Sequence, residues 1–252
     1  MSAVYNAVVS LDHELLLSVL EQGHFVDEPW EEWTPLYALA NNVKWHENIP
    51  KILKTLLEYG ADTNIECEQR LPYRCSTKFY STPLLEVVCR DYKENEECRV
   101  DMILLLINNG ANVTYVDTRG VSIICHAARR DHVYVVQLLV ASGVSPDDLD
   151  EALCEAAYNG NVTVARYLVE LGASTVTVSR NGYTAGQFAR MSNSFGFNFQ
   201  RDAFADELDN VAELKRIARL NYLAIGYDRE RGRGSRFHGM TEDVMRMILN
   251  KI

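Results

Sequence analysis

A short motif recurs along the chain and marks the places where helices are expected to end. Two or three aliphatic residues and a few polar ones are followed by Gly and often by Ala. Gly adopts the left-handed backbone conformation without a Cβ penalty, so it commonly ends a helix and lets the chain reverse. Copies of the motif lie at residues 56–62, 106–112, 139–143 and 168–174, with a weaker one at 19–23.

A second motif precedes the first and marks the places where helices are expected to begin. It reads Thr-Pro-Leu at residues 34–36 and 82–84, with degenerate copies at 122–124, 151–153 and 184–186. Thr can cap the N-terminus of a helix, and Pro is preorganised for the first helical position. Small residues follow on the same predicted helices, where they let two helices approach closely: Ala40, Ala127, Ala128, Ala156, Ala157 and Ala189.

Together the two motifs resemble the ankyrin repeat over residues 1 to about 190. Ala128 and Gly143 lie 15 residues apart, as do Ala157 and Gly172, and the copies that start at 151 and 184 are 33 residues apart. A period of about 33 residues is the period of that family. The resemblance implies an all-α fold, an α-solenoid of stacked helix pairs with hairpin loops, in which each repeat buries its apolar face against its neighbours.

The expected organisation is about five repeats plus the start of a sixth over residues 1–190, followed by a C-terminal helical cap or tail over 191–252. The array departs from the family pattern, because residues 44–48 and 92–97 are insertions. The His that the family places after Thr-Pro-Leu is absent throughout. We therefore expect an irregular array of modest stability.

The charge of the chain argues against nucleic acid and anionic membranes as partners. The net charge is −10, from 25 basic and 35 acidic residues. Residues 191–252 contain 10 basic and 9 acidic residues, so residues 1–190 contain 15 and 26, a balance of −11. An acidic surface repels phosphate groups. No stretch of the sequence approaches the ~18 apolar residues of a membrane span.

Two features favour a reducing, intracellular compartment. The N-terminal apolar run has no basic residue before it and is interrupted at residues 12–14, so no secretory signal is expected. Cys89, Cys125 and Cys154 fall inside predicted helices, where a free Cys acts as a small hydrophobe. We expect a cytoplasmic location, or the host cytoplasm if the irregular repeats belong to a viral or bacterial effector.

The sequence contains no motif for catalysis, a cofactor or a metal. It has no P-loop, no G-x-S-x-G and no H-E-x-x-H, and its six His show no ligand spacing. No Cys pair has C-x-x-C spacing, although Cys67 and Cys75 leave open a disulfide or a metal site. We therefore expect a protein that is not an enzyme and takes no cofactor. A catalytic role for residues 191–252 is the rival reading, but paired acid and base residues are scarce there.

The ankyrin resemblance implies that a protein partner lies along the concave face, which is built from hairpin tips and inner helices. Residues of this face are placed by counting from each Thr-Pro-Leu equivalent, which puts Asp147, Asp148 and Asp150 at the fourth hairpin tip. Trp, Tyr and Arg dominate interface energetics. The candidate protein-binding residues are Trp30, Trp33, Arg70, Tyr73, Arg74, Phe79, Arg90, Arg119, Arg129, Arg130, Tyr158, Arg180 and Tyr183.

Two of these groups have a structural alternative. Trp30 and Trp33 could instead fold back onto the inserts and cover core. Residues 65–80 form a long insert, here called the finger, whose Arg70, Tyr73 and Arg74 could grip a partner. Long inserts without periodicity are often functional but can also be disordered.

The tail carries two partial family resemblances. The segment 240–249 resembles the opening helix of an F-box, and 214–219 resembles the first helix of a SOCS box. Both imply a substrate receptor that bridges a target to a cullin-type ubiquitin ligase through a Skp-type or elongin adaptor. The alternative is a sixth repeat with a capping helix. The residues expected to contact a ligase adaptor are Leu214, Ile217, Met240, Val244, Ile248 and Leu249.

Overall fold

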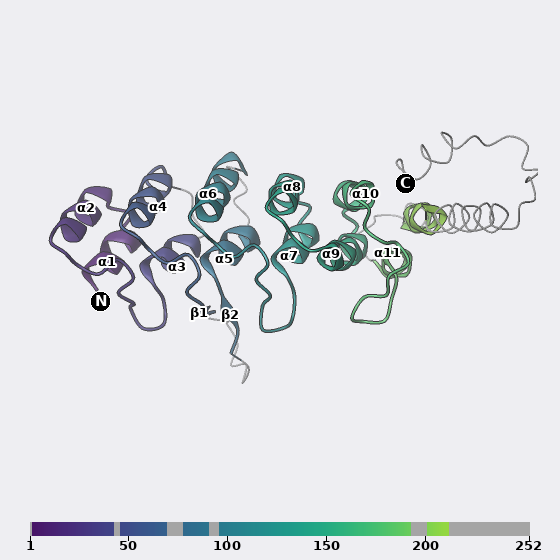
Figure 1. The fold of residues 1–252 in the computed structure, drawn as a ribbon, viewed down its shortest axis with the longest axis horizontal. Helices are drawn as coiled ribbons and strands as arrows, with labels where there is room; N and C mark the ends of the chain where they lie inside the picture. Colours follow the sequence, from purple (N-terminus) through teal and green to yellow (C-terminus); the bar gives the residue numbers. More distant parts are fainter. Residues whose placement is uncertain (1, 43–45, 70–77, 91–95, 193–200, 212–252) are drawn as a thin grey trace, which may run out of the picture. The chain divides into compact units, whose positions relative to one another are not determined.

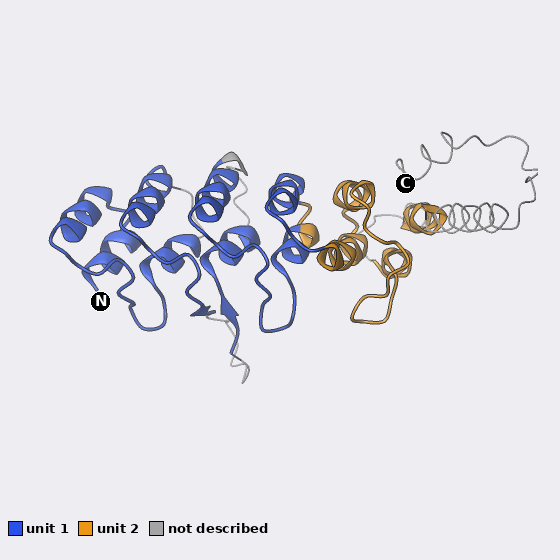
Figure 2. Cartoon of the chain, viewed as in Figure 1, with its two compact units in different colours: residues 1–127, 132–145 blue, residues 128–131, 146–252 orange. Residues whose placement is uncertain are grey.

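The computed structural model describes residues 2–42, 46–69, 78–90, 96–192 and 201–211, and within this part the fold is built from pairs of short helices (Figure 1). Two compact units are distinguished (Figure 2). The first unit comprises residues 1–127 and 132–145, and the second comprises residues 128–131 and 146–252.

The first unit consists of helix pairs stacked side by side. The helices α1, α3, α5 and α7 form an inner row, and α2, α4, α6 and α8 form an outer row (Figure 1). Within each row, α1 contacts α3, α3 contacts α5, and α2, α4, α6 and α8 contact one another in sequence. The bounds are α1 Ala3–Val9, α2 His13–Glu21, α3 Pro35–Ala40, α4 Ile49–Glu58, α5 Pro83–Cys89, α6 Glu96–Asn108, α7 Ile123–Arg129 and α8 Val133–Ala141.

The second unit continues the pattern with α9 (Pro146–Asn159), α10 (Val162–Glu170) and α11 (Ala185–Met191). Helix α9 packs against both α10 and α11. Residues 201–211 are also helical. The all-α fold of stacked helix pairs with hairpin loops that the sequence predicts is therefore confirmed.

The predicted start and stop signals act as expected. The Thr34 hydroxyl accepts a hydrogen bond from the Tyr37 backbone N–H at 3.2 Å, and Thr82 accepts one from Leu85 at 3.4 Å. Thr184 forms a full capping box with Gln187, which satisfies two helix-end donors at once. At the helix ends, glycines take positive φ angles between 82° and 99°: Gly23, Gly60, Gly110, Gly143 and Gly172.

The core of the helix pairs consists of aliphatic and small side chains. Leu16, Leu36, Leu56 and Met102 are fully buried in the first unit. The predicted small residues at the helix contacts have no exposed surface: Ala127, Ala128, Ala156, Ala157 and Ala189. Interiors pack at the density of organic crystals, so larger side chains at these positions would separate the helices.

The hairpin loops of the first unit contain short antiparallel pairings between backbone segments. Strands β1 (Cys67–Glu68) and β2 (Tyr80–Ser81) pair antiparallel at the base of the finger. Single bridges join Trp30 to Trp33 and Val116 to Ser122 in two other loops.

Side chains also link each turn to the next one. Asp27 Oδ2 accepts a hydrogen bond from the Asp62 N–H at 3.0 Å. Asn64 accepts one from the Asn112 N–H at 2.8 Å and donates one to the Gly110 carbonyl at 2.9 Å.

The fourth hairpin differs from the expectation. Asp147, Asp148 and Asp150 were expected at a hairpin tip, but they lie on α9, which begins at Pro146. Pro is favoured at the first helical position, and acidic residues in the first turn interact well with the N-terminal end of the helix dipole. The helix therefore starts five residues before the degenerate motif at 151–153, and no room is left for a hairpin.

Candidate protein-binding surface

The first hairpin tip of the first unit carries Trp30 and Trp33. Their backbones exchange two hydrogen bonds of 3.0 and 3.2 Å, and both side chains are half-buried. The Trp33 indole N–H donates to the Glu68 carbonyl at 2.7 Å, and its ring lies edge-on to Tyr37 with centroids 5.3 Å apart. Trp33 thus ties the tip to the base of the finger, and both tryptophans keep part of their surface open to a partner.

A buried carboxylate lies beneath this tip. Glu86 on α5 is only 2% exposed, and its Oε1 accepts hydrogen bonds from the Tyr37 hydroxyl at 3.0 Å and from the Gln69 amide at 2.7 Å. Burial, followed by the negative charge of Glu86 and its hydrogen bond, raises the pKa of Tyr37 far above its usual value. Arg90 donates to the other oxygen, Oε2, at 3.1 and 3.3 Å. The predicted binding residue Arg90 is therefore also the counter-ion of a buried acid.

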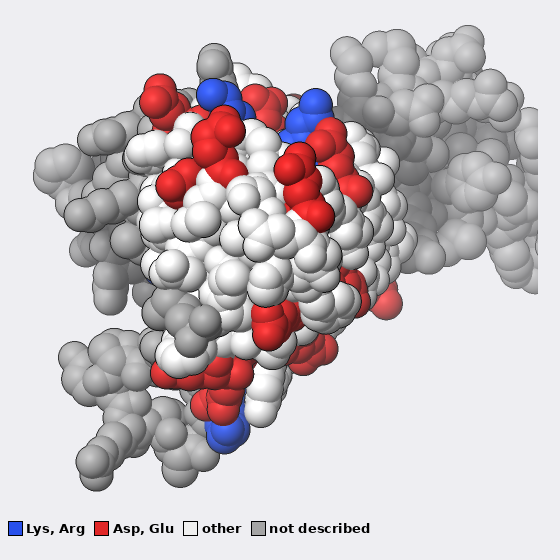
Figure 3. All heavy atoms as spheres, turned by 90° about the vertical axis from the view of Figure 1, so that its left-hand side faces the viewer, with Lys and Arg blue, Asp and Glu red and all other residues white. Residues whose placement is uncertain are grey.

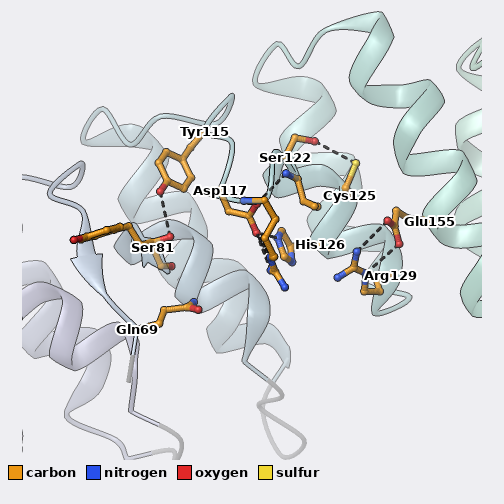
Figure 4. A network of polar contacts seen from close by, with 12 residues as sticks. Gln69, Ser81, Tyr115, Asp117, Ser122, Cys125, His126, Arg129 and Glu155 are labelled. Atoms are coloured by element: carbon orange, nitrogen blue, oxygen red, sulfur yellow. Dashed lines mark hydrogen bonds and ion pairs between the residues drawn. The ribbon is translucent and has the colours of Figure 1, made fainter. Parts of the chain in front are cut away.

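The third hairpin is organised around Asp117. Its Oδ1 accepts hydrogen bonds from the backbone N–H groups of Arg119 and Val121, both at 2.9 Å. Its Oδ2 accepts two from the Arg119 guanidinium, at 2.9 and 2.7 Å, and contacts His126 Nε2 at 3.1 Å (Figure 4). Burial by itself would raise the pKa of Asp117, but the hydrogen bonds from Val121, Arg119 and His126 outweigh it and lower that pKa.

The Arg119 guanidinium also contacts the finger, through the ring of Phe79. Its guanidinium carbon lies 5.6 Å from the centroid of the Phe79 ring, within the range of a cation–π contact. Two predicted binding residues, Phe79 and Arg119, are thus brought together at the base of adjacent loops. Half of the Arg119 side chain stays exposed.

In the second unit, which includes the last two residues of α7, Arg129 forms a two-point ion pair with Glu155. The Nε–Oε2 distance is 3.0 Å and the Nη2–Oε1 distance is 2.9 Å (Figure 4). Such a bidentate pair fixes both the guanidinium and the carboxylate in orientation. The two residues are 26 positions apart in sequence.

Three aromatic rings meet beside this ion pair. Tyr158 at the end of α9 and Tyr183 in the loop before α11 each lie edge-on to Phe188, with centroid distances of 5.6 Å. Phe188 is 8% exposed, whereas Tyr158 is 47% and Tyr183 is 40% exposed. Edge-to-face pairs of this geometry are favourable beyond their buried area. The buried Phe188 therefore holds two predicted binding residues as a partly exposed aromatic cluster.

A cavity of about 630 Å³ opens beside the aromatic cluster. A volume of this size falls within the usual range for ligand pockets. Its lining combines the three rings, two carboxylates and one guanidinium with polar and sulfur-containing side chains: Arg129, Glu151, Cys154, Glu155, Tyr158, Asn159, Asn181, Tyr183, Phe188 and Met191. Arg129, Tyr158 and Tyr183 were predicted to lie on the binding surface, and the structure brings them to one cavity.

The other predicted residues are distributed as follows. Arg130 and Arg180 are exposed in the second unit, and the Arg180 backbone N–H lies 3.4 Å from Glu151 Oε2. The finger residues Arg70, Tyr73 and Arg74 lie outside the described residues, as does Cys75. So do the six residues predicted to contact a ligase adaptor. Cys67 is a free, buried cysteine whose Sγ lies 4.0 Å from the Thr34 hydroxyl.

Glu151, Glu155 and Phe188 are among the cavity residues that sequence reasoning missed. Glu151 was assigned to a helix-start motif, because the early start of α9 at Pro146 was not foreseen. Phe188 follows the Thr184 cap by four residues, so its place on an inner helix could have been read from the motif. Nothing local to Glu155 indicates its partner Arg129.

The described residues contain no metal-type cluster of three or more His, Cys, Asp or Glu side chains. In the same part of the chain, none of the helices has the length and apolar character that crossing a bilayer requires. Figure 3 shows the end of the first unit that carries α1 and α2, where acidic side chains lie in several groups and basic ones are few. This surface fits the acidic balance expected from the sequence.

Comparison with known proteins identifies the repeats. Residues 94–181 match the family model described as ankyrin repeats, in three copies. A putative ankyrin repeat-containing protein of Treponema pallidum (strain Nichols) is 34% identical over 91 residues, which are 34% of this chain and 30% of that protein. The potassium channel AKT2/3 of Arabidopsis thaliana is 28% identical over 163 residues, 63% of this chain and 20% of that protein.

A third relative is the ankyrin repeat and SAM domain-containing protein 6 of Mus musculus, 33% identical over 87 residues, 32% of this chain and 10% of that protein. The chain therefore spans less than a third of the length of each of these relatives. Two of these relatives are named for ankyrin repeats, and in this chain the repeats take the form of Thr-capped inner helices, outer helices closed by glycine, and hairpin loops. These matches support ankyrin repeats over residues 94–181, and the stacked helix pairs of the described residues fit a helical solenoid of that type.

Proposed function

We propose that this protein is a non-catalytic adaptor that binds a target protein through its hairpin tips and inner helices. The observation that carries the proposal is the aromatic cluster of the second unit. Tyr158 and Tyr183 remain 47% and 40% exposed although Phe188 holds both rings in place. Rigid, partly exposed tyrosines beside an arginine are typical of the residues that dominate protein interfaces.

The first unit supplies a second contact region of the same kind. Trp30 and Trp33 are half-buried at one tip, and Arg119 stacks on Phe79 at the base of the next loop. The side chains of Trp33, Phe79 and Arg119 are already held by intramolecular contacts, so little of their conformational entropy is lost when a partner binds. Ankyrin repeats support a protein–protein interaction role, and these side chains support its location on the tips and inner helices.

The proposal is tested with the full chain as bait in affinity purification from cell lysate. The Tyr158→Ala/Tyr183→Ala double variant is compared with Tyr134→Ala, because Tyr134 is also an exposed tyrosine but lies on the outer helix α8. We expect the partners of the wild-type chain to be retained by Tyr134→Ala and lost from the double variant. Circular dichroism confirms that each bait is folded. The single variant Tyr183→Ala serves as a second test, because it changes a loop residue and leaves helix α9 intact. Equal recovery of every partner by all baits would contradict the proposed surface.

The ubiquitin-ligase alternative remains a second proposal for the tail. It rests on the F-box and SOCS-box resemblances of residues 214–249, which lie outside the described part of the chain. A bait truncated before Asp209 tests it directly. Recovery of a Skp-type adaptor or the elongin pair with the full chain, but not with the truncated chain, is the expected result. If both baits recover the same proteins and no ligase subunit, the tail has no such role.

A further inference from the structure

We propose that the cavity of the second unit receives a lysine or arginine side chain of the protein partner. This inference rests on the proposed function and specifies the chemistry of the contact. The cavity combines three features that a cationic side chain requires: aromatic rings, an uncompensated carboxylate and apolar wall atoms.

The aromatic rings supply the first feature. A lysine ammonium or arginine guanidinium within about 6 Å of a ring centroid is attracted by the quadrupole of the ring. Tyr158, Tyr183 and Phe188 line the same cavity, and their edge-to-face packing fixes the position of each ring before a ligand arrives. Phe188 and Met191 add apolar surface, against which the alkyl stem of lysine or arginine can pack.

Glu151 supplies the second feature. Arg129 and Glu155 neutralise each other through their two-point ion pair. Glu151 lies on the same wall, and within the described residues its carboxylate accepts one hydrogen bond, a long one of 3.4 Å from the Arg180 backbone N–H. No basic side chain in the described part of the chain pairs with it. A negative charge without a counter-ion is therefore left at the cavity.

The helix that carries Glu151 has a negative charge overall. Helix α9 contains five acidic residues and no Lys or Arg. Of these, Asp150 accepts hydrogen bonds from the Ser174 N–H at 2.6 Å and from the Thr177 hydroxyl at 2.7 Å, neither of which neutralises its charge. Complementary charge steers an incoming partner and selects against partners of the wrong sign.

An anionic occupant is disfavoured by the same contacts. Arg129 is the basic residue that lines the cavity, and its Nε and Nη2 donors are directed to Glu155. A carboxylate or phosphate group in the cavity would lie beside the carboxylates of Glu151 and Glu155. The geometry therefore favours a cationic side chain over an acidic one.

The test is an NMR titration of the isotope-labelled full chain with short capped peptides that differ only in the central residue. That residue is lysine, arginine, norleucine or glutamate. Lysine and norleucine have similar alkyl stems, so their comparison isolates the charge. We expect the lysine and arginine peptides to shift resonances of residues around the cavity at millimolar concentration. The norleucine and glutamate peptides should bind at least about fivefold more weakly.

Three variants complete the experiment. Glu151→Gln keeps the size of the side chain and removes its charge, and should weaken the lysine peptide by about fivefold or more. Tyr183→Ala removes one ring from a loop and should weaken it similarly, whereas Tyr134→Ala on α8 should not change it. Equal binding of lysine and norleucine peptides, binding unaffected by Glu151→Gln, or no shifts with any peptide would each overturn the inference. The partner-capture experiment with Tyr158 and Tyr183 variants would still stand on its own, so failure of the two proposals is distinguishable.

Discussion

Arg129 and Glu155 hold each other in a two-point ion pair at the wall of the cavity, with N–O distances of 3.0 and 2.9 Å. The pair cancels one of the two carboxylates that line the cavity. It therefore sets the charge that an incoming side chain encounters, and removing the arginine has a different effect from removing the glutamate.

The first prediction is that Arg129→Gln strengthens the binding of a lysine peptide. The substitution frees the Glu155 carboxylate and removes a positive charge from the cavity, so affinity should rise by a few-fold. The pair is partly exposed, and its loss should lower the free energy of unfolding by about 1 kcal/mol or less. NMR titration measures the first effect and denaturant unfolding the second. A weaker affinity for the lysine peptide would show that Arg129 itself contacts the ligand.

The second prediction concerns the glycine that ends α6. Gly110 has φ +86°, and a Cβ added there would meet no atom within 4 Å. Gly110→Ala should therefore lower the free energy of unfolding by about 1 kcal/mol for conformational reasons alone. Gly110→Asn should cost less, because Asn tolerates the left-handed region. Urea midpoints of the two variants check this order, and equal losses would contradict the conformational explanation.

The third prediction is a pH dependence that Asp117 imposes on stability. The folded pKa of Asp117 is lowered from its ordinary value of 3.8. Its contribution is therefore fully present above that value and is lost as the pH falls through the lower folded pKa. Asp117→Asn should destabilise the protein at neutral pH and flatten the acid side of its stability profile.

The measurement is denaturant unfolding at a series of pH values between about 2 and 7. Asp101→Asn is the matched control, because Asp101 is exposed on α6 and should leave the profile nearly unchanged. Arg119 and His126 face Asp117 and are left intact in both variants. An Asp117→Asn profile parallel to that of the wild type would contradict the assignment.

The fourth prediction addresses the buried acid beneath the first hairpin tip. Tyr37→Phe deletes the hydroxyl that donates to Glu86 at 3.0 Å without emptying the core. Hydrogen bonds to charged groups contribute about 1.5–3 kcal/mol, and we expect a loss of that size. Tyr134→Phe on the exposed face of α8 should change stability by less than about 0.5 kcal/mol. Thermal or urea unfolding of the two variants makes the comparison, and a loss no larger than that of Tyr134→Phe would show that the hydrogen bond contributes little.

The fold could be predicted from the sequence to the extent that its signals are local. Thr34, Thr82 and Thr184 cap helices and the glycines take positive φ because both effects depend on a few neighbouring residues. The start of α9 was missed although its signal is also local. Gly143 and the motif at 151–153 suggested a hairpin, but Pro146 and the two aspartates after it start a helix instead.

The candidate site was predictable only in part, because its contacts join residues of different repeats. Counting along the repeat placed Tyr158 and Tyr183 on the inner surface. Their meeting at Phe188 depends on how α9 packs against α11, which the pattern of one repeat does not specify. The partner of Arg129 lies 26 residues away, and a charged residue alone does not indicate which of many carboxylates it meets.

The bonds between successive turns have a consequence for how such a sequence can drift over evolutionary time. Asp27 and Asn64 reach forward with their side chains, but what they contact at residues 62, 110 and 112 is backbone. Any amino acid except proline offers the N–H at positions 62 and 112, so those positions can vary without breaking the link. Substitutions at positions 27 and 64 would remove it, and their effect would fall on the following repeat. The stability of one repeat thus depends partly on residues 27 and 64 of the repeats before it, so selection for that stability acts on those residues.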